Sequence, residues 1–147
     1  MTNLQEFVIF RLNKEFYGIN IQYVENIEKV VPITRVPYTL PQVKGVVNLR
    51  GIIVPIIDLR VRFGLSPIET TDDSRMIIVN YEDYKIGLLV DSSSEVLPIQ
   101  DDEVDLAPSV SREPASEYIK NIGKKNGRVI MLIDLMKVLG LEESSVV

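Results

Sequence analysis

The stretch Lys44-Gly-Val-Val-Asn-Leu-Arg-Gly-Ile-Ile-Val-Pro-Ile-Ile-Asp-Leu59 decides the fold, because two apolar runs flank the tetrapeptide Asn-Leu-Arg-Gly at positions 48–51. Short β-branched runs bounded by turn residues are typical of strands, so the stretch predicts two strands with a bend at Arg50-Gly51. A buried strand has no room for an unpaired charge, and the Arg50 side chain is expected to project outward. Two interpretations of Arg50 stay open. It is either a solvated turn residue, at most salt-bridged to a nearby Glu for about 0–1 kcal/mol, or an interface anchor on a rigid hairpin.

The composition removes most catalytic machinery. The 147 residues include no Cys and no His, which excludes disulfides, thiolate sites and the commonest general base and metal ligand. A net charge of −5 and a pI near 4.8 argue against a nucleic-acid partner. The chain has no apolar run of the roughly 18 residues that a membrane span needs, and its N-terminus lacks the pattern of a secretory signal. We therefore expect a cytoplasmic globular protein that is not an enzyme.

Two groups of carboxylates are nevertheless candidates for chemistry. Asp101, Asp102, Glu103 and Asp105 offer oxygen ligands for a hard cation, but the spacing of a calcium loop is absent, which favours a solvated acidic loop. Asp58 and Asp134 are candidates for paired catalytic acids. Each follows an apolar run and precedes a short helical pattern, however, which favours helix caps. We predict no catalytic residue, no metal site and no cofactor.

The chain repeats itself. Val54–Leu65 and Ile130–Leu141 agree at one constant offset that superposes Asp58 on Asp134, and Phe7–Ile21 and Met76–Val90 agree at another that superposes Gly18 on Gly87. Coincidental punctuation of β strands is the alternative to a duplication. A duplication predicts halves at about 7–65 and 76–141, each with about five short strands, and small closed barrels would bury such strands without exposed edges. We predict a mostly β fold of two small five-stranded barrels in tandem.

One segment before the central stretch is predicted to be helical. Asn20 is a candidate N-cap, and Val24, Ile27 and Val30 follow it at a spacing of three residues.

Three segments of the chain resemble the CheW-like family of chemotaxis coupling proteins. The resemblance rests on Phe16–Ile21 followed by Val24 and Ile27, on Lys44–Leu59, and on Tyr84–Asp91 followed by Glu95-Val96-Leu97. It runs from about Glu6 to Leu141, and the order Asn-Leu-Arg-Gly then Pro-Ile-x-Asp-Leu is specific. It implies a single CheW-like domain over residues 1–147, built of two SH3-like barrels with a shared apolar core and a few short helices.

The resemblance also implies a function. Members of the family are non-enzymatic scaffolds that join the cytoplasmic tips of methyl-accepting chemoreceptors to the regulatory domain of the histidine kinase CheA. The chain would be cytoplasmic, would reach membrane receptor arrays only through these partners, and would not insert into the membrane. The kinase-facing residues are not implied one by one, and apolar surface at the barrel ends is the expectation.

Receptor-facing residues carry over by position. The surface between the barrels would include Val24, Asn26, Gly45, Arg50, Gly87 and Val96. The two valines would offer apolar contact and Arg50 polar anchoring, while the two glycines serve backbone geometry or close approach rather than contact. Relatives can carry a carboxylate at the position of Asn26, a natural partner for Arg50. The amide can only hydrogen-bond, unless Glu25 or Glu28 supplies the charge.

Two alternative functions stay open at this level. The chain can be the CheW-like module of a larger kinase or of an adaptor fused to a receiver domain, although its length argues against that. Small SH3-like barrels also bind nucleic acid, against which the acidic balance and the lack of an aromatic and basic face argue.

Overall fold

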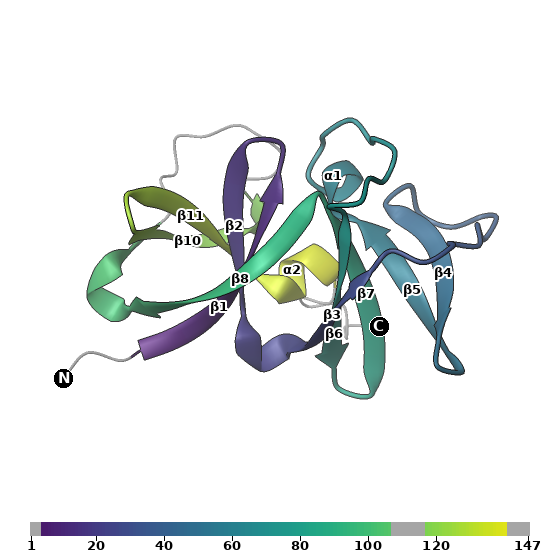
Figure 1. Cartoon of the computed structure of the whole chain (residues 1–147), viewed down its shortest axis with the longest axis horizontal. Coiled ribbons are helices and arrows are strands. Elements are labelled where there is room, and N and C mark those ends of the chain that lie inside the picture. Colours follow the sequence, from purple (N-terminus) through teal and green to yellow (C-terminus); the bar gives the residue numbers. More distant parts are fainter. Residues whose placement is uncertain (1–3, 107–116, 141–147) are drawn as a thin grey trace.

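The computed structural model describes residues 4–106 and 117–140, and the strands within these ranges form two sheets that lie side by side (Figure 1). The six-stranded sheet has the order β8 (Ser92–Gln100), β1 (Leu4–Leu12), β2 (Glu15–Asn20), β11 (Arg128–Ile133), β10 (Ile119–Lys125), β9 (Val104–Leu106). The five-stranded sheet has the order β3 (Val24–Lys29), β6 (Arg75–Tyr81), β7 (Tyr84–Val90), β5 (Ile52–Asp58), β4 (Val43–Leu49). The prediction of a mostly β fold with two small β subdomains is confirmed.

The helices are short and begin at polar caps. They are η1 (Ile21–Tyr23), α1 (Leu59–Arg62), η2 (Asp101–Glu103) and α2 (Leu135–Leu139). Asp58 accepts a hydrogen bond from the Arg60 amide at 3.0 Å, and Asp134 accepts one from the Lys137 amide at 3.4 Å. Both aspartates are therefore helix caps, as predicted. Among the described residues, no helix has both the length and the apolar character needed to cross a membrane.

The prediction of a helix after Asn20 is wrong beyond the first turn. The Asn20 side chain does accept a hydrogen bond from the Gln22 amide at 3.0 Å, but the 3-10 turn ends at Tyr23. The next six residues form β3 and alternate between half-buried and exposed side chains. The two-residue period of this strand, paired with β6, prevails over the helical spacing of the three apolar residues.

The bend predicted at Arg50-Gly51 is confirmed. Both residues have positive φ, 52° and 88°, between paired strands β4 and β5. Two-residue hairpin loops favour this conformation because its twist matches that of the flanking strands. The Gly51 amide donates to the Asn48 side chain at 2.8 Å and rigidifies the turn. The β10–β11 hairpin has the same geometry at Asn126-Gly127, with φ of 55° and 75°.

Each sheet draws strands from both predicted halves of the chain. The β1–β2 hairpin pairs with β8 and β11, and the β6–β7 hairpin pairs with β3 and β5. The chain consequently crosses between the sheets twice, from β2 to β3 and from β7 to β8. The two subdomains are interleaved rather than consecutive along the chain. The duplication, its halves at 7–65 and 76–141 and the single domain over 1–147 stay predictions.

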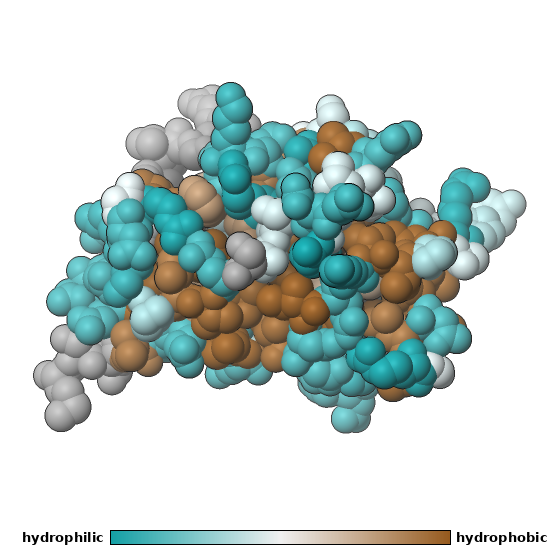
Figure 2. Space-filling model, in the orientation of Figure 1, coloured by the Kyte–Doolittle hydropathy of each residue, from teal (hydrophilic) through white to brown (hydrophobic). Residues whose placement is uncertain are grey.

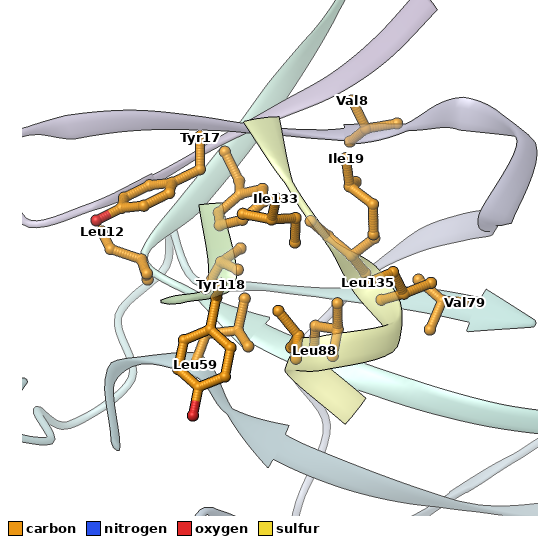
Figure 3. Close-up of a cluster of buried hydrophobic side chains, with 14 of the residues drawn as sticks. Val8, Leu12, Tyr17, Ile19, Leu59, Val79, Leu88, Tyr118, Ile133 and Leu135 are labelled. Carbon is orange, nitrogen blue, oxygen red and sulfur yellow. The ribbon is translucent and has the colours of Figure 1, made fainter. Parts of the chain in front are cut away.

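The interleaving explains why the hairpin strands are apolar on both faces. Alternate residues of β1 and β6 point either into their own barrel or toward the other sheet, so these strands read as continuous apolar runs. Each barrel has its own small cluster, and a third, larger cluster joins both sheets to the two α-helices. Figure 3 shows side chains of this shared core pointing toward one another from both sheets; among them are Val8, Tyr17 and Ile19 of the six-stranded sheet and Val79 and Leu88 of the five-stranded sheet.

Candidate functional site

The predicted receptor-facing residues fall on both sheets. Five belong to the five-stranded sheet or its turn, and the sixth lies on β8 of the other sheet, where its side chain is exposed. The five are Val24 and Asn26 on β3, Gly45 on β4, Arg50 in the β4–β5 turn and Gly87 on β7, and the sixth is Val96.

Arg50 has a carboxylate partner from β3, the strand at the opposite edge of the five-stranded sheet from β4. Its Nη2 donates to Glu28 Oε2 at 2.9 Å, and the Asn26 amide donates to the same oxygen. Glu28 therefore supplies the charge that Asn26 lacks, two residues further along β3. The Arg50 side chain is still 69% exposed, whereas that of Glu28 is 22% exposed. The carboxylate orients the guanidinium and leaves most of its surface to a partner.

β3 takes part in a second ion pair. Both oxygens of Glu25 accept from Lys85 Nζ of β7, and one of them also accepts from the Asn80 amide of β6 at 2.8 Å. The hydrogen bond from Lys85, followed by that from Asn80, lowers the pKa of the Glu25 carboxyl below its ordinary value. β3 thus carries two acidic side chains, the exposed Glu25 and the half-buried Glu28, each held by a cation from outside the strand.

Gly45 and Gly87 are required by close packing of strands. A Cβ on Gly45 would lie 2.2 Å from the backbone oxygen of Thr34, where the chain makes an isolated bridge to Val46. A Cβ on Gly87 would lie 2.5 Å from Cδ1 of the buried Ile56, the residue that Gly87 faces on β5. Both glycines are buried, which agrees with the expectation of close approach rather than partner contact.

Replacing Gly45 with alanine is expected to lower the free energy of unfolding by about 2–3 kcal/mol, because a backbone oxygen must move to admit the methyl group. Gly51→Ala is the matched control: its φ is also positive, but a Cβ there meets nothing within 4 Å, so only the cost of about 1 kcal/mol for the backbone conformation is expected. Urea unfolding measures both. Equal losses in the two variants would contradict the close-approach role of Gly45.

Exposed apolar side chains accompany the two ion pairs, and the sequence did not predict all of them. Ile52 and Ile53 follow the turn directly and are 47% and 60% exposed, and Ile21 and Ile27 are exposed next to Val24. Figure 2 shows apolar side chains gathered in two areas of the face in view, one over β1 and β8 and one toward β5 and β7, with polar side chains between them. The alternation along β3 carried the signal for Ile27 and Glu28, and reading that segment as a helix obscured it.

The acidic cluster at Asp101–Asp105 is used in local contacts. Glu103 binds Lys125 and accepts from the Gln100 amide at 2.9 Å, and Asp105 pairs with Lys124 at 2.6 Å. The hydrogen bond from the Gln100 amide, together with Lys125, lowers the pKa of the Glu103 carboxyl. In the described parts of the chain, no three acidic, His or Cys side chains are grouped as metal ligands.

The fold and this surface together suit a binding role. Two interleaved β subdomains present an exposed arginine on a rigid turn, flanked by paired acids and exposed isoleucines, and such features suit recognition of another macromolecule. The geometry favours a β-sheet protein that binds another macromolecule.

Comparisons with known proteins name the family. Residues 6–143 match the model of the CheW-like domain. The chain is 38% identical to the chemotaxis protein CheW of Klebsiella aerogenes, over 97% of this chain and 86% of that protein, and 36% identical to CheW of Bacillus subtilis, over 95% and 90%. The crystal structure of the scaffolding protein TtCheW from Thermoanaerobacter tengcongensis is similar, with a TM-score of 0.84, 36% identity and 92% coverage of each chain.

The chain therefore belongs to the CheW-like family, and the predicted resemblance is confirmed. It is a chemotaxis scaffold protein and not an enzyme, since the relatives are named as chemotaxis and scaffolding proteins. It interacts with other proteins in chemotaxis signalling complexes.

Proposed function

We propose that this scaffold couples methyl-accepting chemoreceptors to the regulatory domain of the histidine kinase CheA. The observation that carries the proposal is the exposed Arg50 guanidinium, oriented by Glu28 on a hairpin turn and flanked by exposed Ile52 and Ile53. An ion pair this exposed contributes only about 0–1 kcal/mol to folding. The arrangement is better explained by binding, because arginines beside apolar side chains are frequent interface anchors.

The receptor-contact surface comprises Val24, Asn26, Arg50 and Val96, with Gly45 and Gly87 holding the strands beneath it. The exposed Val96 and half-buried Val24 supply apolar contact, and Arg50 supplies hydrogen bonds to a polar group on the receptor hairpin. Asn26 acts through Glu28, since its amide holds the carboxylate that orients Arg50. The four residues thereby combine an apolar contact area with one directional anchor.

The kinase-contact surface lies at the other end of the five-stranded barrel. Tyr38 and Leu40 precede β4 and are fully and 62% exposed, and the length of β4 separates them from the Arg50 turn. At about 3.3 Å per residue, seven residues span about 20 Å. Two partners can therefore bind at once without sharing a surface. The scaffold works in the cytoplasm and reaches the membrane through its receptors.

A three-component binding assay tests the coupling function. The chain is mixed with a receptor signalling hairpin and with the CheA regulatory domain, separately and together, and complexes are followed by sedimentation velocity. We expect two binary complexes and one ternary complex. Tyr38→Glu combined with Leu40→Glu is expected to remove the kinase domain and to retain the receptor hairpin. Failure of the unmodified chain to bind either partner would contradict the proposed function.

A further inference from the structure

The two crossings between the sheets are built alike. At each, the second strand of a hairpin runs parallel to a strand that ends in an aspartate-capped helix: β7 beside β5 and α1, and β2 beside β11 and α2. The register also agrees, because Ile56 faces Gly87 two residues before Asp58, and Leu132 faces Gly18 two residues before Asp134. The space beside each helix can therefore be compared residue by residue.

At the β7–β8 crossing an arginine fills this space. Arg60 is the second residue of α1 and binds Asp91 with two hydrogen bonds, from Nε at 2.8 Å and from Nη2 at 2.7 Å. Its Nη2 also donates to the Asn13 side chain at 2.6 Å, and its Nη1 to the Ser66 carbonyl at 3.0 Å. The cavity that remains has a volume of about 10 Å³, about the size of one water.

At the β2–β3 crossing the same space is open. The second residue of α2 is Met136 and the residue that corresponds to Asp91 is Gln22, so neither member of the ion pair is present. Both line a pocket of about 430 Å³. Its lining includes the buried apolar side chains of Phe7, Ile99 and Leu132.

The charges around this pocket favour a cation. Asp101 and Asp134 line the pocket, and Lys120 supplies the single ammonium group among its lining residues. Gln5, Asn20 and Asn121 add polar amide side chains to the lining, and the oxygens of Gln5 and Asn20 also accept hydrogen bonds from Asn20 and from the Gln22 amide. A guanidinium group offers five donors in a plane, and its aliphatic stem packs on apolar surface. A volume of about 430 Å³ lies within the range of about 300–1,000 Å³ typical of ligand pockets.

We propose that this pocket accepts an arginine side chain of a partner protein, which takes the place that Arg60 takes at the other crossing. Gln22 and Tyr23 line the pocket and directly precede Val24 on the chain. A partner seated on the receptor-contact surface therefore has the pocket within reach. The arginine site itself is independent of the coupling function, and its test uses neither receptor nor kinase.

NMR titration of the ¹⁵N-labelled full chain tests the site. The probe is N-acetyl-arginine amide, which carries the side chain as a peptide would, and the matched neutral probe is N-acetyl-citrulline amide. We expect saturable shifts of the Gln22, Lys120, Asn121 and Met136 amides in the millimolar range with the arginine probe, and at least tenfold weaker binding of the citrulline probe, since the charge is lost. Absence of saturable shifts, or an equal response to both probes, would overturn the proposal.

Three variants locate the binding. Met136→Arg places the chain's own guanidinium in the pocket and is expected to weaken probe binding at least tenfold, whereas Val129→Arg, on an exposed position of β11 outside the pocket lining, leaves it unchanged. Asp101→Asn changes an exposed residue of the pocket lining and is expected to weaken probe binding several-fold. This variant tests the site if Met136→Arg does not fold. Undiminished binding in a folded Met136→Arg or Asp101→Asn variant places the probe elsewhere and refutes the site.

Discussion

Replacing Arg50 with glutamate is expected to weaken binding of a receptor signalling hairpin about 100-fold, while the free energy of unfolding changes by no more than about 1 kcal/mol. The substitution removes the Arg50 guanidinium, whose Nη2 lies 2.9 Å from Glu28 Oε2, and places a second carboxylate beside Glu28. The partner then meets two like charges where it found a cation. Stability is little affected, because the side chain is mostly exposed and the turn is held by the backbone and by Asn48.

Isothermal titration calorimetry with the receptor hairpin measures the effect. Asn126→Glu is the matched control, because Asn126 occupies the corresponding place in the β10–β11 turn with nearly the same φ. This control is expected to bind the hairpin as the unmodified chain does. Unchanged binding by Arg50→Glu would remove Arg50 from the receptor-contact surface, and equal losses in both variants would show a general effect of charge.

Replacing Arg60 with methionine is expected to lower the free energy of unfolding by about 3 kcal/mol. The Arg60 and Asp91 side chains are only 11% and 20% exposed, and the substitution leaves Asp91 half-buried without its guanidinium. Asp91 lies where the chain passes from β7 to β8, and its amide donates to the Arg11 carbonyl at 3.1 Å. The loss therefore weakens a contact between the two subdomains. Methionine is the natural residue at the corresponding position of α2 and fits a helix.

Urea unfolding measures this loss, with Lys14→Met in the exposed β1–β2 turn as the control, which we expect to change stability by less than about 0.5 kcal/mol. The double variant Arg60→Met, Asp91→Leu is expected to recover part of the stability, since no unpaired charge stays behind. A loss in Arg60→Met no larger than in the control would show that the ion pair does not hold the crossing.

The same cluster sets an acid limit on stability. Burial alone raises the pKa of Asp91, but hydrogen bonds from Arg60 and Asn13 outweigh it and hold the pKa below its ordinary value of 3.8. A carboxyl with a lowered folded pKa contributes stability that is fully present above the unfolded value and is lost as pH falls through the folded value. The difference in the free energy of unfolding between the unmodified chain and Asp91→Asn should therefore be constant above about pH 5. It should shrink as the pH falls further, below 3.8.

The sequence located those features that depend on neighbouring residues. The Asn-Leu-Arg-Gly turn needs two residues with positive φ, and the caps at Asp58 and Asp134 need only an oxygen before a helical turn. The apolar runs likewise identified most strands. The helix prediction for the segment after Asn20 was wrong because the spacing of its apolar residues fits both the helical and the strand period. Only pairing with β6 makes the segment a strand.

Features that join distant parts of the chain required the tertiary structure. Glu28 as the partner of Arg50 follows from the closure of a barrel, which brings β3 to the β4–β5 turn across 22 residues. The composition alone removed the usual catalytic groups, and the local pattern alone placed Arg50 on a turn. Which hairpin enters which sheet, the filling of one crossing by Arg60 and the open pocket at the other were decided only by the fold. Strand exchange is a long-range pairing, and no local propensity distinguishes a hairpin that stays in its own half from one that crosses.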